Sequence, residues 1–245
     1  MIRKIQTMSM ELIIESFPEL SESVIDDINN LLTLIDDTFN NYNSNSYISK
    51  LNLKKKTIDD SPKVFKYVKE LADEYRKKTN GYFEYEFNGF LNFNGIVKAY
   101  AISKIKDILL TNNINNFLIN FGGDIKTHGI DLKVNNNWVV GIKNPYTKND
   151  ILKRIKLYKN YSISTSGSYE RGYHILNPIL KKSATYFDSV TVVSESIIDS
   201  DVFATALYAM EDNAYTYILE KNILALFIKN NKIYFNSNLQ KLCNQ

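Results

Sequence analysis

The segment Asn92–Tyr100 carries residue types suited to binding a phosphate group. It reads NFNGIVKAY, a glycine-containing turn that opens a helix. A helix start offers backbone N–H groups and the positive end of the helix dipole, both of which favour an anion. Lys98, one turn into the helix, would reach a phosphate oxygen. The alternative is an ordinary loop-to-helix junction with a surface lysine, because motifs this short recur by chance.

Asp201 and Thr205 form a second candidate site. They are four residues apart and would share one face of a helix. A carboxylate and a hydroxyl suit Mg²⁺ when phosphates and water supply its remaining ligands. The alternative is that Asp201 only stabilises the start of its helix, where acidic residues are favoured.

Serines and a histidine form a third candidate site. Ser164–Tyr169 reads STSGSY, and His174–Pro178 follows as HILNP. Small hydroxyl residues around a glycine can line a polar pocket, and His174 would act as a general base or orient a phosphate. The alternative is a serine-rich loop with a structural histidine. Tyr42 lies near a polar segment and could stack on a flat ring, although the chain has 17 Tyr and 13 Phe.

The composition excludes several classes of function. The net charge is +3, from 30 basic and 27 acidic residues, which is too balanced to indicate nucleic-acid binding. Two histidines and one cysteine leave little room for zinc or iron–sulfur sites. With a single cysteine, Cys243, the chain has no internal disulfide. The G-x-S-x-G pattern of serine hydrolases is also absent from the sequence.

Hydropathy gives an expectation for location. The sequence has no apolar run long enough to span a bilayer, and residues 1–5 lack the apolar core of a signal peptide. We expect a cytoplasmic location for the chain as given. An exported or membrane-anchored form is the alternative if the N-terminus has been trimmed.

Periodicity predicts the elements that position these residues. Alternating apolar residues from Met8 to Ile14 predict a strand, and helical spacing over 24–39 predicts an amphipathic helix. Ser61 and Pro62 are expected to begin another helix, as its cap and first residue, and Ser200 to cap a helix through Tyr208. Further helices are expected over 95–110 and 214–220, and strands over 117–121, 138–142, 155–158, 189–193, 223–228 and 232–235.

Helices and strands are interleaved without regular βαβ spacing, and no linker divides the chain. We therefore predict an α+β fold, a single compact domain over 1–245 with a mixed or antiparallel sheet and packed helices. Asn230 and Asn231 predict a hairpin turn between the last two strands.

The order of these segments resembles one family, the ApbE-type FAD:protein FMN transferases. Asn92–Tyr100 is similar to the family pattern D-L-G-G-I-A-K-G-Y, and 119–124 to I-N-x-G-G-D. Similar matches to family patterns occur at Tyr42 with 46–52, at 81–84, at 138–145, at 164–169, at 174–178, at 189–193 and at 201–205.

The resemblance implies both an activity and a set of site residues. The activity is Mg²⁺-dependent transfer of the FMN half of FAD to a Thr or Ser hydroxyl of an acceptor redox protein, with release of AMP. Gly95, through its carbonyl, Asp201 and Thr205 would hold the metal, and His174 matches the catalytic histidine. The residues implied to touch FAD are Met8, Tyr42, Tyr82, Phe83, Glu84, Asn92, Lys98 and Ile175.

Several positions depart from the family pattern. Asn92 and Asn177 replace aspartates, Glu84 replaces an aspartate, and the segments before Asn92 and His174 are short. These departures keep two alternatives open. One is an FAD pyrophosphatase that gives FMN and AMP, and the other is a degenerate, non-catalytic FAD-binding protein.

Overall fold

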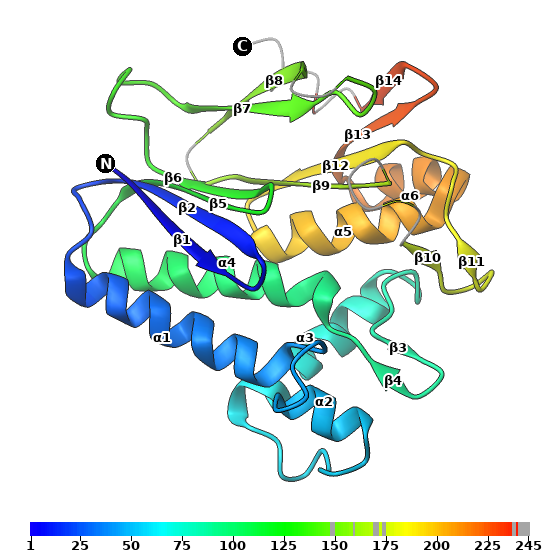
Figure 1. Ribbon diagram of the computed structural model, residues 1–245. Coiled ribbons are helices and arrows are strands. Elements are labelled where there is room, and N and C mark those ends of the chain that lie inside the picture. Colours follow the sequence, from blue (N-terminus) through cyan, green and yellow to red (C-terminus); the bar gives the residue numbers. More distant parts are fainter. Residues whose placement is uncertain (148–149, 159, 169–171, 173–174, 237–238, 240–245) are drawn as a thin grey trace.

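An eight-stranded antiparallel sheet is the centre of the computed structural model (Figure 1). The structure describes residues 1–147, 150–158, 160–168, 172, 175–236 and 239. The strand order is β1-β2-β5-β6-β9-β12-β13-β14, and each neighbouring pair is antiparallel. The α+β prediction is confirmed.

The strands of this sheet are β1 Ile2–Thr7, β2 Met10–Phe17, β5 Asn116–Phe121, β6 Asp124–His128, β9 Ser162–Gly167, β12 Ser189–Ser194, β13 Leu224–Lys229 and β14 Lys232–Phe235. Three two-stranded ribbons pair β3 Glu86–Phe87 with β4 Phe90–Leu91, β7 Trp138–Lys143 with β8 Ile151–Leu157, and β10 Leu176–Asn177 with β11 Lys182–Ser183. The α-helices are α1 Glu22–Phe39, α2 Tyr47–Asn52, α3 Lys63–Lys78, α4 Asn94–Thr111, α5 Ile197–Met210 and α6 Ala214–Lys221, and a short 3-10 helix, Glu211–Asn213, joins α5 to α6.

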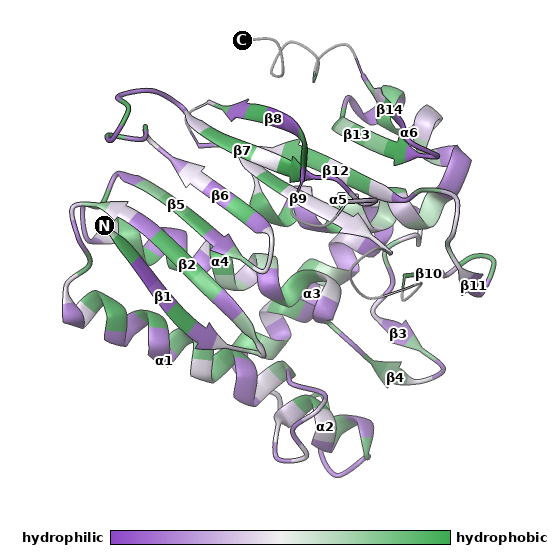
Figure 2. Cartoon of the chain, turned by 45° about the horizontal axis from the view of Figure 1, so that its top comes forward, coloured by the Kyte–Doolittle hydropathy of each residue, from purple (hydrophilic) through white to green (hydrophobic). Residues whose placement is uncertain are grey.

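The two faces of the sheet are covered by different elements. Helices lie on one face, and the β7–β8 ribbon lies on the other (Figure 1). Alternate residues along each strand point to opposite faces. In β12, Val190 and Val192 therefore join the helix-side core, whereas Val193 packs with the ribbon. α1 alternates apolar and polar residues as expected of a helix with one buried side (Figure 2).

Two predicted helix starts differ from the structure. α3 begins at Lys63 with Pro62 at the cap position and no side-chain cap, because the Ser61 hydroxyl donates to the carbonyl of Ile58 instead. α5 begins at Ile197, and its cap is Ser196, which accepts from the N–H of Asp199. Ser200 lies inside this helix and is fully buried.

The N-terminal hairpin also differs from the predicted strand. Met8 and Ser9 have φ of 48° and 59°, so they form the two-residue turn between β1 and β2, and Met10 is the first residue of β2. Left-handed backbone at both positions is the geometry of a tight hairpin turn. The predicted turn at Asn230 and Asn231 is confirmed, with φ of 51° and 60°.

A buried lysine ties β6 to the loops around it. Lys126 is 2% exposed, and its ammonium donates to the carbonyls of Asn160 and Glu195, each at 2.6 Å. Burial, together with the nearby positive charge of Lys106, lowers the pKa of Lys126 to about 8. The contact with Glu195 fixes the chain just before the start of α5.

Among the helices of the described residues, none combines the length and apolar character needed to cross a membrane.

Candidate active site

α4 and α5 bring the predicted metal ligands together. The backbone N–H of Ala99 donates to the Asp201 carboxylate. In an α-helix, the N–H of residue 99 also points towards the carbonyl of residue 95. The Gly95 carbonyl and the Asp201 carboxylate therefore meet at the same N–H group. A Cβ on Gly95 would lie 3.1 Å from the Phe83 ring, so glycine allows this close packing.

Asp201 is a buried carboxylate whose surroundings suit a bound cation. It is 7% exposed, and its Oδ2 has no hydrogen-bond partner among the described residues. Burial raises the pKa of Asp201 well above the ordinary carboxyl range, and the charge of Asp124 raises it further. Lys98 and the Ala99 hydrogen bond oppose that shift. A bound cation would satisfy the orphaned oxygen.

Thr205 lies one helical turn after Asp201 and faces β9. Its hydroxyl is 3.0 Å from the Ser166 hydroxyl. Residues 164–167 of the predicted serine segment belong to strand β9, so the alternative of a serine-rich loop is wrong for them. No group of three or more His, Cys, Asp and Glu side chains is placed to hold a metal in the described part of the chain. The donor set is thus carbonyl, carboxylate and hydroxyl oxygen, which suits Mg²⁺ completed by substrate phosphates.

Lys98 forms an ion pair that the sequence did not predict. Its ammonium is 2.5 Å from Oδ2 of Asp124, and Asp124 is 2% exposed. Gly122 and Gly123, with φ of 59° and 97°, turn the chain from β5 into Asp124, and the N–H of Gly123 donates to the Asn120 side chain. The I-N-x-G-G-D pattern marked this segment, but spacing alone did not reveal its contact with α4.

The start of α4 differs from the expected array of free N–H groups. Asn92 Oδ1 accepts from the N–H of Asn94, and the N–H groups of Ile96 and Val97 both donate to the Phe93 carbonyl. At this end of the helix the N–H groups of Asn94 and Ile96 thus have partners within the protein, whereas the Val97 bond is the ordinary first bond of an α-helix. The binding of a phosphate at this turn stays a prediction. Asn92 needs no charge for its role, because an amide oxygen accepts this bond as a carboxylate would.

Asn52, at the end of α2, fixes the chain just before α4. Its Oδ1 accepts from the N–H of Leu91 at 2.8 Å, and its Nδ2 donates to the Leu91 carbonyl at 2.9 Å. Asn41 adds a longer bond to the same carbonyl and accepts from Asn52. The sequence motif over 46–52 does not predict this contact, because Leu91 is distant from Asn52 in the chain.

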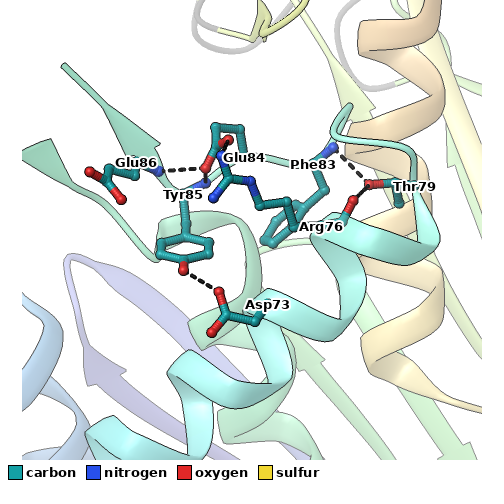
Figure 3. Close-up of polar contacts among 7 residues, drawn as sticks. All are labelled: Asp73, Arg76, Thr79, Phe83, Glu84, Tyr85 and Glu86. Carbon is teal, nitrogen blue, oxygen red and sulfur yellow. Dashed lines mark hydrogen bonds and ion pairs between the residues drawn. The ribbon is translucent and has the colours of Figure 1, made fainter. Parts of the chain in front are cut away.

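Glu84 is held within the protein (Figure 3). Its Oε1 accepts from the N–H groups of Tyr85 and Glu86, and its Oε2 pairs with Arg76 at 2.7 Å. The side chain of Glu84 is 10% exposed, whereas that of Arg76 is 46% exposed. The contact expected between Glu84 and a nucleotide therefore stays a prediction, and Arg76 is an unpredicted neighbour of that segment.

The remaining predicted residues differ in their exposure to solvent. Phe83 is buried, and Tyr82 and Ile175 pack partly buried against the helix-side core. Tyr42 is 92% exposed. Met8 occupies the hairpin turn described above. His174 lies outside the described residues.

Asn177 has a structural role like that of Asn92. Its Oδ1 accepts from the N–H groups of Ile179 and Leu180, which shapes the turn between β10 and β11. The loss of an aspartate at this position leaves that turn intact, because the bonds need an oxygen acceptor and no charge.

Solved structures share this fold. The flavin transferase ApbE from Vibrio cholerae superposes with a TM-score of 0.85 at 19% identity, covering 99% of this chain and 98% of that one. The ApbE protein from Thermotoga maritima gives 0.84 at 18% identity, with 100% and 99% covered. A sequence model of the ApbE family matches residues 86–227, more than half of the chain. The chain belongs to the ApbE family.

Curated relatives agree with this assignment. An FAD:protein FMN transferase of Klebsiella pneumoniae (strain 342) is 29% identical over 163 residues, 62% of this chain and 49% of that protein. The FAD:protein FMN transferase of Buchnera aphidicola (subsp. Baizongia pistaciae) is 34% identical over 152 residues, 58% of this chain and 44% of its own length. The matched part of this ApbE-family chain spans about half the length of these relatives.

Proposed function

We propose that residues 1–245 form one flavin transferase domain that moves the FMN half of FAD onto a Thr or Ser hydroxyl of an acceptor redox protein. The observation that carries the proposal is the convergence of Asp201 and the Gly95 carbonyl beside the Lys98–Asp124 pair. Family membership and the transferase names of the relatives support it.

The reaction would exchange one phosphorus–oxygen bond for another. The acceptor hydroxyl oxygen forms a bond to the FMN-side phosphorus, and the bond from that phosphorus to AMP breaks, so AMP leaves with the electron pair. His174 would take the hydroxyl proton. Asp201, Thr205 and the Gly95 carbonyl would hold Mg²⁺, which when bound supplies positive charge to the diphosphate. Lys98 would add a second positive charge.

Two features support an active site rather than a degenerate one. The buried Oδ2 of Asp201 has no hydrogen-bond partner among the described residues. Burying such a group costs free energy, and a bound cation would offset that cost. Asn92 and Asn177 keep the hydrogen bonds of their turns, so these substitutions do not disrupt the local backbone.

Mass spectrometry of an acceptor protein incubated with FAD and Mg²⁺ tests the proposal. We expect the acceptor to gain one FMN and AMP to be released, with both lost on chelation or in Asp201→Ala. Asp212→Asn, a change at an exposed carboxylate, is the control and should retain activity. Free FMN with AMP and no acceptor adduct would instead identify a pyrophosphatase. Intact FAD with every acceptor tried, or full activity of Asp201→Ala, would refute the proposal.

A further inference from the structure

Asp124 is a buried carboxylate to which the proposed reaction gives no role. Its side chain is 3% exposed and pairs with Lys98, the residue expected to contact the diphosphate. The Lys98 ammonium therefore has two alternative partners: Asp124 in this structure, and the diphosphate in the expected substrate complex.

The path of the Lys98 side chain is fixed by its neighbours. A Cβ on Gly122 would lie 3.9 Å from Cδ of Lys98 and 2.8 Å from Sδ of Met10. The lysine stem therefore runs along the glycine turn towards Asp124, with Met10 close beside it. Asn120 holds this turn through the N–H of Gly123 at 3.0 Å. Asp124 is therefore a preformed partner for the ammonium, not one reached by a flexible surface chain.

The ion pair is next to the candidate cation site. Ala99, which follows Lys98, donates its N–H to Asp201. The charges of Asp124 and Lys98 both act on the Asp201 carboxylate, so two buried carboxylates and one ammonium lie in the same region of the protein. The Lys98 ammonium and the Asp124 carboxylate, 2.5 Å apart, attract each other strongly in a partly desolvated site. A divalent cation beside Asp201 would also attract both carboxylates and would therefore compete with the ammonium for them.

We propose that Asp124 is a positioning residue that holds Lys98 away from the diphosphate until a divalent cation binds beside Asp201. The cation then takes over the neutralisation of the carboxylates, and the ammonium becomes available to the phosphate. FAD and the cation would in this way strengthen each other's binding, and the coupling is necessarily reciprocal. This inference rests on the proposed function for the identity of the diphosphate ligand.

Equilibrium binding of FAD, followed by flavin fluorescence with and without Mn²⁺, tests the role of Asp124. Chromatography of each sample establishes that the FAD is intact. Asp124→Asn keeps the size of the side chain but removes the charge that retains the ammonium. We expect it to bind FAD about tenfold more tightly than the wild type without cation, since a charge-assisted contact is gained. The gain in affinity from Mn²⁺ should shrink by a similar factor.

Two further variants separate the proposal from simpler effects. Asp107→Asn removes an exposed carboxylate that pairs with Lys104 and Lys106 on the same helix. It should change the affinity for FAD neither with nor without Mn²⁺. In a Lys98→Met background, Asp124→Asn should lose most of its effect, because the ammonium that it frees is absent. An equal effect in both backgrounds would show that Asp124 acts only through its own charge and would overturn the proposal.

Other results are equally decisive. Weaker or unchanged FAD binding by folded Asp124→Asn without cation would overturn the proposal. If that variant does not fold, Lys98→Met alone decides: we expect it to lower FAD affinity with Mn²⁺ much more than without, and an equal loss would overturn the inference. A wild-type chain that binds no FAD under either condition would instead refute the proposed function.

Discussion

Asn52 is predicted to connect the stability of the protein to its binding of FAD. Asn52→Ala removes two hydrogen bonds to the backbone of Leu91 and one to the side chain of Asn41. Each such bond contributes about 1 kcal/mol, and the N–H of Leu91 would lose its partner. Asn41 would still donate to the Leu91 carbonyl at 3.3 Å. The expected loss is therefore about 2–3 kcal/mol. For a chain of this size that is roughly 4–12 °C in Tm.

The functional effect should follow from the position of Leu91. It directly precedes Asn92, whose side chain accepts from the N–H of Asn94, the first residue of α4, and α4 carries Gly95 and Lys98. A small displacement of this start would weaken FAD binding about tenfold or more, because site geometry tolerates little error.

Differential scanning fluorimetry and flavin fluorescence titration measure the two effects on the same samples. Asn45→Ala is the matched control, since Asn45 is exposed in the same segment, and it should leave both values unchanged. If Asn52→Ala lowers Tm as expected while FAD affinity stays at the wild-type value, the link from α2 to the site is wrong. An unchanged Tm would contradict the hydrogen-bond argument itself.

Three further predictions concern the metal, the glycine turn and the buried lysine. Mg²⁺ at about 100 times its dissociation constant should stabilise the wild type by about 2.7 kcal/mol, or roughly 5–11 °C, and Asp201→Asn should lose this shift. The raised pKa of Asp201 means that Mg²⁺ affinity should fall as pH is lowered, since the ligand must be deprotonated; calorimetric titration showing no such fall would contradict the assignment. Gly122→Ala places a Cβ 2.8 Å from Met10 at a φ of 59°. It should lower the free energy of unfolding by more than the roughly 1–2 kcal/mol expected for the control Gly89→Ala, where φ is also positive but no atom lies within 4 Å. Equal losses in urea unfolding would refute the packing argument. The pKa of Lys126 is lowered from 10.5 to about 8 in the folded protein, so the unfolded state holds the proton more tightly. The free energy of unfolding should therefore rise by about 3 kcal/mol as the pH increases from about 8 to 10.5. In denaturant titrations, Lys126→Met should lack that rise.

Local patterns predicted the elements but not their caps. Apolar spacing placed α1, α4 and β5 close to their observed bounds, because amphipathic periodicity is set by which side is buried. The cap residues were wrong where a competing bond existed. Ser61 donates to its own turn rather than capping α3, and Ser196 caps α5 in place of Ser200.

The candidate site was predictable where chemistry depends on close spacing. Asp201 and Thr205 share a helix, so their proximity follows from the α-helical repeat. The contacts of Asp124 with Lys98 and of Asn52 with Leu91 join segments distant in the chain, and single-sequence periodicity contains no information about such pairs. Asn92 and Asn177 looked like losses in the sequence, but in their local turns an amide oxygen accepts the backbone hydrogen bonds as a carboxylate oxygen would.

The topology of the sheet has a consequence for how the chain folds during synthesis. β2 pairs with β5 from Leu12↔Phe121 to Phe17↔Asn116, so the partner of β2 is made about 100 residues later. At roughly 5–20 residues per second, the inner edge of the first hairpin waits on the order of 5–20 s for its partner. During that time its backbone N–H and C=O groups are open to other strands. Slow translation before residue 121 would therefore favour aggregation of the nascent chain more than slow translation after it.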